Sequence, residues 1–149
     1  MLFRSTPPNA KALNQPDQAK VLIVCAELDS LESQKKAQVF MERGIEVMAM
    51  ANPFGKVDLP RLFSYLAKER EMNEIHIEAG YKLNGSMLRE NCVDELLLYY
   101  APFFMGEGIG VANVPTLATL DVPKEWEVID QRLFGSDLRL NLVKKYIQK

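Results

Sequence analysis

The alternation of short β-type runs with helix-type segments constrains the fold of this chain more than any other feature. The expected strands are Val21–Ala26, Ile45–Met50 and Glu74–Glu78. The first is a continuous apolar run, as expected for a strand that is covered on both faces. A helix-type segment follows each of the three runs. Strands that alternate with helices form parallel βαβ units with right-handed crossovers, so we expect these three strands in one sheet.

Capping residues and apolar spacing indicate where the helices begin and end. Asp29-Ser30, together with Glu32, offers an N-cap for a first helix that runs to Arg43, where Gly44 ends it. Asp58 caps a second helix. The core-facing stripe of that helix, at i, i+3, i+4 and i+7, is Leu59, Leu62, Phe63 and Leu66. A third, short helix ends before Asn91, which takes the left-handed position that glycine usually holds.

The C-terminal part of the chain indicates antiparallel strands. Glu95–Pro102 is a long β-rich run, and Trp126–Phe134 and Asp137–Lys145 are expected to form a hairpin with Gly135-Ser136 at its turn. We therefore predict a single domain over residues 1–149 and an α/β fold of three layers. Its sheet is mixed and largely parallel, with helices on both faces and a C-terminal antiparallel hairpin.

Composition and charge exclude several classes of protein. With 48% hydrophobic and 26% charged residues, the chain has the make-up of a globular domain and not of a disordered one. No apolar run approaches the ~20 residues of a membrane span, and the first residues lack the apolar core of a secretory signal. The formal net charge of −2 argues against a nucleic-acid surface, which needs a basic patch. We expect a cytoplasmic protein that binds neither nucleic acid nor a membrane.

Two cysteines and one histidine leave little scope for metal chemistry. Cys25 lies in an apolar strand and is expected to be a buried thiol. Neither Cys25 nor Cys92 has CxxC or Cys/His spacing, so no metal site is expected, and lone cysteines of an intracellular chain are usually reduced. His76 alternates with Ile75 and Ile77 and should face away from them. We interpret it as a structural histidine, with a place in the lining of a cleft as the alternative.

The junction after Glu74–Glu78 is the place where a binding site is most strongly indicated. In open α/β sheets, ligands bind beyond the carboxyl ends of the strands. A helix that starts there presents unpaired backbone N–H groups and a partial positive charge, which together bind anions such as phosphates. Gly80 would let a ligand approach the backbone, Gly85 would leave the first turn unobstructed, and Glu78 would project a carboxylate into the same crevice. By spacing alone, the pattern is neither GxGxxG nor a P-loop and favours a structural role.

The residues that follow this junction resemble a long block of one protein family. The matching motifs are Glu78-Ala79-Gly80, Leu83 to Ser86, Val93-Asp94-Glu95-Leu96, Tyr100-Ala101-Pro102 and Gly106-Glu107-Gly108. Outside this block, the matches are Arg4-Ser5-Thr6-Pro7, Lys11, Val57-Asp58-Leu59 and Gly135-Ser136-Asp137-Leu138. In their joint order and spacing they resemble the C-terminal portion of the reductase domain of the bifunctional riboflavin-biosynthesis deaminase–reductase. That domain has a fold of the dihydrofolate-reductase type.

The resemblance implies a reaction and a set of site residues. The reaction is the NADPH-dependent reduction of the ribosyl group of 5-amino-6-(5-phosphoribosylamino)uracil to a ribityl group. Glu78 would contact this phosphoribosylamino-pyrimidine substrate. The cofactor phosphates would lie against the helix start, whose residues are Gly80, Tyr81, Lys82, Leu83, Asn84, Gly85 and Ser86. The resemblance assigns no residue of this chain to catalysis itself, because the hydride belongs to the cofactor.

Two departures from the family pattern bear on what this chain does alone. The family's reductase begins with a strand, a helix and further strands that have no counterpart in this sequence, so we expect weak NADPH binding and slow turnover or none. The zinc-deaminase signature, H-x-E together with P-C-x-x-C, is absent, so no deaminase activity is expected. A sheet without its first strands exposes edges and apolar side chains. This favours a homodimer, or dependence on another chain, with Phe103–Met105 or the C-terminal strands in the contact.

Two other functions are compatible with the same fold, because fold does not determine function. The first is a noncatalytic module of the dihydrofolate-reductase type that binds a nucleotide or a partner subunit. The second is a reductase that acts on a related pterin or folate.

Overall fold

The structure is a computed structural model that describes residues 6–13, 20–116 and 125–145. The chain divides into two compact units, Met1–Asn73 and Glu74–Lys149. Among the described residues, no helix combines the length and the apolar character needed to cross a membrane.

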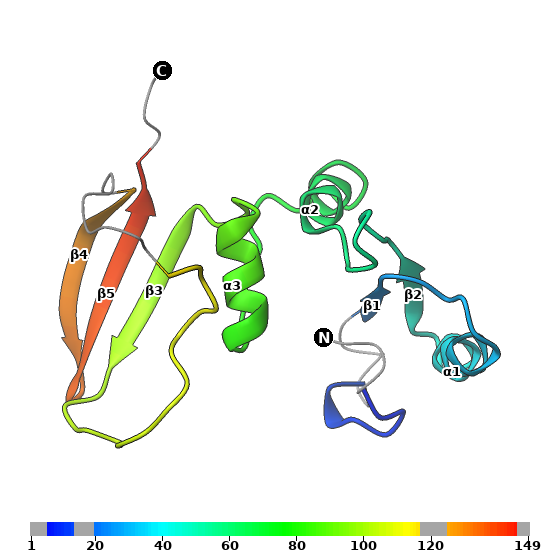
Figure 1. Ribbon diagram of the computed structural model, residues 1–149, viewed down its shortest axis with the longest axis horizontal. Helices are drawn as coiled ribbons and strands as arrows, with labels where there is room; N and C mark the ends of the chain where they lie inside the picture. The colour runs from blue at the N-terminus through cyan, green and yellow to red at the C-terminus, as the bar shows by residue number, and fades with distance from the viewer. Residues whose placement is uncertain (1–5, 14–19, 117–124, 146–149) are drawn as a thin grey trace. The chain divides into compact units, whose positions relative to one another are not determined.

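The first unit contains a small parallel sheet and two helices (Figure 1). Its elements are the 3-10 turn η2 (Lys11–Leu13), β1 (Leu22–Cys25), α1 (Leu31–Met41), β2 (Glu46–Ala49) and α2 (Leu59–Lys68). β1 and β2 pair in parallel from Leu22 opposite Glu46 to Cys25 opposite Ala49. The predicted βαβ connection, strand to helix to parallel strand, is confirmed here.

A cluster of buried side chains forms the core of the first unit. Its members come from η2, β1, α1 and the residue before β2, and they are Leu13, Ile23, Cys25, Ala37, Phe40 and Ile45. Phe40 is fully buried. Burial of such an aromatic side chain contributes about 1.5–3 kcal/mol. The core therefore ties the 3-10 turn to the parallel strands and to one face of α1.

Local capping explains the bounds of the helices. The Ser30 side chain accepts a hydrogen bond from the Ser33 N–H at 3.1 Å, and Gly44 has φ of 74°, a conformation that other residues rarely adopt. The Asp58 carboxylate accepts from the Arg61 N–H at 3.0 Å at the start of α2. The predicted helix starts at Asp29-Ser30 and Asp58 are confirmed, whereas α1 ends at Met41 with Glu42 as its C-cap, two residues before the predicted end at Arg43.

The second unit contains one helix and an antiparallel sheet. Its elements are α3 (Tyr81–Arg89), β3 (Glu95–Tyr100), β4 (Trp126–Phe134) and β5 (Asp137–Lys144). β5 lies between β3 and β4 and pairs antiparallel with both (Figure 1). Asn91, with φ of 59°, ends α3, and Gly135, with φ of 64°, forms the hairpin turn. Both positions were predicted.

The faces of the antiparallel sheet differ in character, as its register shows. One face carries Leu138, Leu140 and Leu142 of β5, and the opposite face carries Arg139 and Asn141. The register shifts between Val128 and Asp130, which marks a bulge in β4. At the start of β4, the Lys144 ammonium lies 5.9 Å from the centre of the Trp126 ring, within the range of a cation–π contact.

Two details of the predicted sheet are wrong. The described residues form two separate sheets, and Glu74–Glu78 is not a strand. This segment still alternates as an extended chain does, because Ile75 and Ile77 are half-buried while their neighbours are exposed. No strand among the described residues pairs with it, and a strand exists only where backbone hydrogen bonds form a ladder. The parallel part of the described structure is therefore β1 and β2.

Candidate functional site

The start of α3 is open to an anion. Gly80 is the N-cap and provides no side-chain hydrogen bond to the helix, and helix geometry leaves the N–H groups of Tyr81, Lys82 and Leu83 without intrahelical partners. Gly80 is exposed, and a Cβ atom placed on it would meet nothing within 4 Å. The Lys82 side chain is also exposed. Together these features fit one phosphate group at the positive end of the helix dipole.

Glu78 lies two residues before this helix start and has an exposed side chain. Its Oε1 atom is 3.5 Å from Nε2 of His76, and the two side chains are 88% and 71% exposed. As expected, His76 faces away from the half-buried Ile75 and Ile77, and its side chain is exposed beside Glu78. An extended chain places residues i and i+2 on one side, and that spacing could have indicated the His76–Glu78 pair from the sequence.

The last three residues of the expected cofactor turn already have contacts within the protein. The Asn84 amide donates to the Val111 carbonyl at 2.9 Å, and the Ser86 hydroxyl donates to the Lys82 carbonyl at 3.3 Å. A Cβ atom on Gly85 would lie 2.1 Å from the Asn113 carbonyl oxygen. The expected turn thus divides into two parts. Gly80–Leu83 is the part at the open helix start, and Asn84–Ser86 is the part that has contacts with other residues of the protein.

The segment 110–114 of the same chain packs against α3, and the sequence analysis did not predict this contact. The Asn113 N–H donates to the Tyr81 carbonyl at 3.0 Å, and the Tyr81 hydroxyl donates to Asn113 Oδ1 at 3.3 Å. Arg89 donates to the Asn113 carbonyl. An isolated glycine inside a short helix, here Gly85, is the signal that could have indicated such a close approach.

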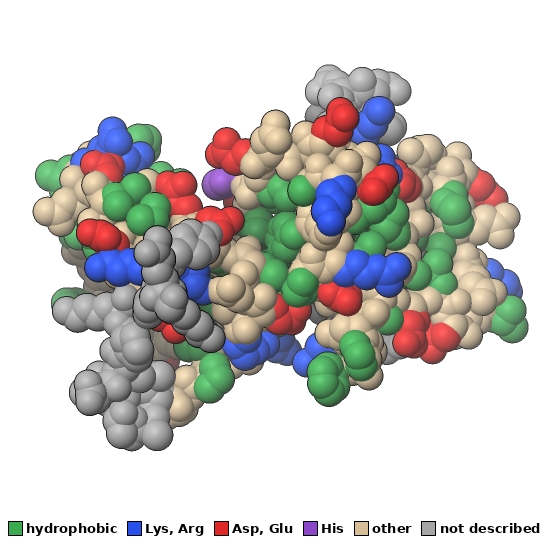
Figure 2. Space-filling view, turned by 90° about the horizontal axis from the view of Figure 1, so that it is seen from above, with side chains coloured by type: hydrophobic (Ala, Val, Ile, Leu, Met, Phe, Trp, Pro, Cys, Tyr) green, Lys and Arg blue, Asp and Glu red, His purple; other side chains and the backbone are tan. Residues whose placement is uncertain are grey.

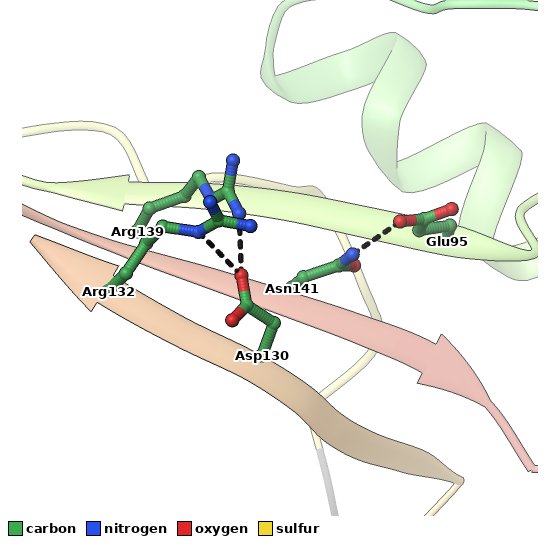
Figure 3. A network of polar contacts seen from close by, with 5 residues as sticks. All are labelled: Glu95, Asp130, Arg132, Arg139 and Asn141. Atoms are coloured by element: carbon green, nitrogen blue, oxygen red, sulfur yellow. Dashed lines mark hydrogen bonds and ion pairs between the residues drawn. The ribbon is translucent and has the colours of Figure 1, made fainter. Parts of the chain in front are cut away.

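A polar network crosses the antiparallel sheet (Figure 3). Asp130 Oδ2 accepts from Arg139 at 2.5 Å and from Arg132 at 2.9 Å, while Asn141 donates to Glu95 at 2.5 Å. Hydrogen bonds from Arg139, and next from Arg132, hold the pKa of Asp130 below its usual range. Each member forms at least one of these contacts, while Arg139 Nε and Asn141 Oδ1 are buried without a hydrogen-bond partner among the described residues.

The cysteines and the charged groups offer no second site among the described residues. Burial raises the pKa of the Cys25 thiol, and Cys25 and Cys92 form no disulfide among the described residues. No group of three His, Cys, Asp or Glu residues in the described part of the chain is placed to hold a metal ion. On the face shown in Figure 2, basic side chains lie among acidic and apolar ones.

Comparison with protein families gives a match over most of the chain. The profile of the RibD C-terminal domain matches residues 4–138. The riboflavin biosynthesis protein RibD of Chlamydia muridarum is 34% identical over 103 residues, which are 69% of this chain and 26% of that protein. The RibD of Escherichia coli is 36% identical over 90 residues, which are 60% of this chain and 24% of that protein. The chain thus spans about a quarter of the length of these relatives.

A shorter relative and two solved structures extend this comparison. The 2,5-diamino-6-ribosylamino-4(3H)-pyrimidinone 5′-phosphate reductase of Archaeoglobus fulgidus is 28% identical over 102 residues, 67% of this chain and 42% of that protein. Acinetobacter baumannii RibD superposes with a TM-score of 0.74 at 21% identity, over 95% of this chain and 35% of that one. A pyrimidine reductase-like protein of Corynebacterium diphtheriae gives 0.67 at 18% identity, over 91% and 54%. These structures confirm the predicted α/β fold class.

Proposed function

Because this chain belongs to the RibD C-terminal domain family, we propose that it is a reductase of riboflavin biosynthesis. The reaction is the NADPH-dependent conversion of the ribosyl group of 5-amino-6-(5-phosphoribosylamino)uracil to a ribityl group. The observation that carries this proposal is the family match over residues 4–138, together with the relative whose name states a pyrimidinone phosphate reductase. That match extends over both compact units, which supports a single functional domain.

Glu78 is the residue we propose for substrate binding. Its carboxylate is exposed and lies two residues before the open helix start, so it can accept a hydrogen bond from a sugar hydroxyl beside a bound cofactor. His76, 3.5 Å from Glu78, is placed to orient that carboxylate. Hydrogen bonds to a charged group contribute about 1.5–3 kcal/mol, enough to set the position of a ribose.

The helix start Gly80–Ser86 is the part we propose for the cofactor. The backbone N–H groups of Tyr81, Lys82 and Leu83 would hold a phosphate, with the exposed Lys82 ammonium as a further cation. Asn84, Gly85 and Ser86 would support this turn through their contacts within the protein. When bound, NADPH supplies the hydride, and the protein supplies position and charge.

The assembly and location of the protein are also proposals. Phe103, Phe104 and Met105 are 64%, 105% and 86% exposed and follow one another in the chain. Such a contiguous apolar run favours burial against a second copy, as in a homodimer. The pathway that we propose is cytoplasmic.

The test is a binding and turnover assay on the purified chain. Titration with NADPH, followed by nuclear magnetic resonance because affinity is expected to be weak, measures the cofactor site. Oxidation of NADPH in the presence of the phosphoribosylamino-pyrimidine measures turnover. Binding of both ligands with slow turnover supports the proposal. Binding of NADPH without any effect of the pyrimidine phosphate would favour the noncatalytic nucleotide-binding module instead.

A further inference from the structure

Asn113 lies against one face of α3 and contacts three successive turns of it. Tyr81, Gly85 and Arg89 are four residues apart and therefore share this face. The Asn113 backbone packs on Gly85, where a Cβ atom would come within 2.1 Å of its carbonyl oxygen. The Asn113 N–H and Oδ1 bind the Tyr81 carbonyl and hydroxyl, and the Asn113 carbonyl accepts from Arg89.

α3 depends on contacts of this kind because its own sequence does little to order it. The helix has nine residues, its N-cap Gly80 forms no side-chain cap, and it carries Gly85 in its interior. Helices of this length are marginal in isolation, and an interior glycine weakens them further. The order of its first turn must therefore come from tertiary contacts, and the hydrogen bonds between Asn113 and Tyr81 act on that turn directly.

The same contacts hold the long connection that follows β3. Figure 1 shows this connection passing back beside α3. A Cβ atom placed on Gly110 would lie 4.0 Å from the Tyr81 ring, and the Asn84 amide donates to the Val111 carbonyl at 2.9 Å. The exposed Ile109 directly precedes these anchored residues. Asn113, which binds Tyr81, and Val111, which binds Asn84, thus join the connection to α3.

We propose that Asn113 is a positioning residue for the cofactor: it holds the first turn of α3, through Tyr81, in the geometry that binds NADPH. This inference rests on the proposed function. Asn113 itself does not touch the ligand in this scheme. Its effect is preorganisation, because N–H groups that are already oriented bind an anion without the entropic cost of ordering them.

Three variants separate this role from a general effect on folding. Asn113→Ala and Tyr81→Phe remove the same side-chain hydrogen bond from either end and keep the backbone bond between the two residues. Gly85→Ala introduces the Cβ atom that must displace the Asn113 backbone, although alanine is the better helix former. The matched control is Asn52→Ala, which removes side-chain hydrogen bonds to Phe54 and Lys56 in a turn of the first unit.

Two measurements are made on the full chain. Titration with NADPH by nuclear magnetic resonance gives Kd, and amide hydrogen exchange gives the protection of the Asn113 N–H and of the first turn of α3. We expect Asn113→Ala and Tyr81→Phe each to raise Kd about 3- to 10-fold, and the double variant to lose no more than either single one. Gly85→Ala should raise Kd more and abolish the protection of the Asn113 N–H, with the helix content unchanged or higher.

The outcomes distinguish this inference from the proposed function. If the parent chain binds NADPH and Gly85→Ala leaves Kd unchanged, or if Asn52→Ala weakens binding as much, Asn113 has no positioning role. A parent chain with an unprotected Asn113 N–H would overturn the inference without any ligand. If the Asn113 N–H is protected in the parent and no NADPH binds even with the pyrimidine phosphate present, both the positioning role and the cofactor assignment fail.

Discussion

At the scale of single residues, Glu78 and Gly80 carry the chemistry proposed for this chain, and they make different demands on the structure. Glu78 acts through a charged side chain that is 88% exposed. Gly80 acts through the absence of a side chain, since its surroundings are open. Substitutions at the two positions should therefore affect different ligands.

Glu78→Gln keeps the shape of the side chain and removes its charge. Because a charge-assisted hydrogen bond is worth about 1.5–3 kcal/mol, kcat/KM for the pyrimidine substrate should fall roughly 10- to 100-fold. The affinity for NADPH should barely change. Steady-state kinetics with the pyrimidine substrate and direct NADPH titration measure the two effects. Glu74→Gln, an exposed carboxylate in the same segment, is the control. An unchanged kcat/KM would make Glu78 a solvated residue only.

Gly80→Val should have the opposite effect. A branched side chain beside the helix start blocks the approach of a phosphate, so the Kd for NADPH should rise at least about tenfold. Stability should change little, because a Cβ atom at this position meets nothing within 4 Å. Thermal unfolding and NADPH titration of the same sample decide the matter. A variant that unfolds early but binds normally when folded would contradict the assignment.

The contact between Gly85 and Asn113 shows what local patterns cannot predict. Glu78, Gly80 and the helix start could be proposed from the sequence because a strand-type run, a glycine and a helix-type segment follow one another directly. Asn113 lies in a connection without periodicity, and only the folded chain brings it to α3. The role that we propose for Asn113 rests on the close approach of its backbone to Gly85, and residue spacing in the sequence does not predict that approach.

At the scale of elements, the boundaries that depend on neighbouring residues were predicted well. Ser30, Gly44, Asn91 and Gly135 set their turns and caps by their own backbone and side-chain preferences. Glu74–Glu78 was predicted as a strand from its alternation, and that alternation is present. The assignment failed because a strand also requires a partner, and no strand of the described residues provides one. Strand pairing depends on two segments, so the sequence of one segment alone does not predict it.

The β4–β5 hairpin should be sensitive to acid through Asp130. Arg139 and Arg132 lower the pKa of Asp130 in the folded state. A lowered folded-state pKa stabilises the fold above about pH 4, the ordinary value, and this contribution is lost as the pH falls through the folded-state value. Asp130→Asn should therefore unfold at lower urea than the parent at neutral pH, and the difference should close in acid. Asp137→Asn, in the same hairpin, is the control. A difference independent of pH would exclude this ion pair as its cause.

The apolar segment Phe103–Met105 should control self-association. Burial of one phenylalanine side chain contributes about 1.5–3 kcal/mol, so Phe104→Ser should weaken a homodimer roughly 10- to 100-fold. Sedimentation over a range of concentrations measures this change. Phe54→Ser removes an equally prominent side chain, 84% exposed, from the first unit and should have no effect. A parent chain that stays monomeric at high concentration would rule out the dimer.

At the scale of the whole molecule, the chain is two compact units that one family profile covers together. The first unit is built around a parallel β1–β2 pair, and the second around an antiparallel sheet. The proposed ligand contacts, Glu78 and the start of α3, are all in the second unit. The predicted α/β class is correct for the molecule, since class follows from the alternation of elements, whereas the division into two sheets follows from pairing.

The position of Trp126 gives the chain an internal optical probe. It is the sole tryptophan of the sequence, and it lies at the start of β4 under the Lys144 ammonium. Indole emission therefore reports on the antiparallel sheet, whereas far-ultraviolet dichroism detects α1 and α2 of the first unit and α3 of the second, and so reports on both units. If the units unfold as one, the two signals must give the same midpoint in urea. We expect them to diverge, with dichroism changing over a wider range than emission, and coincident curves would show a single cooperative body.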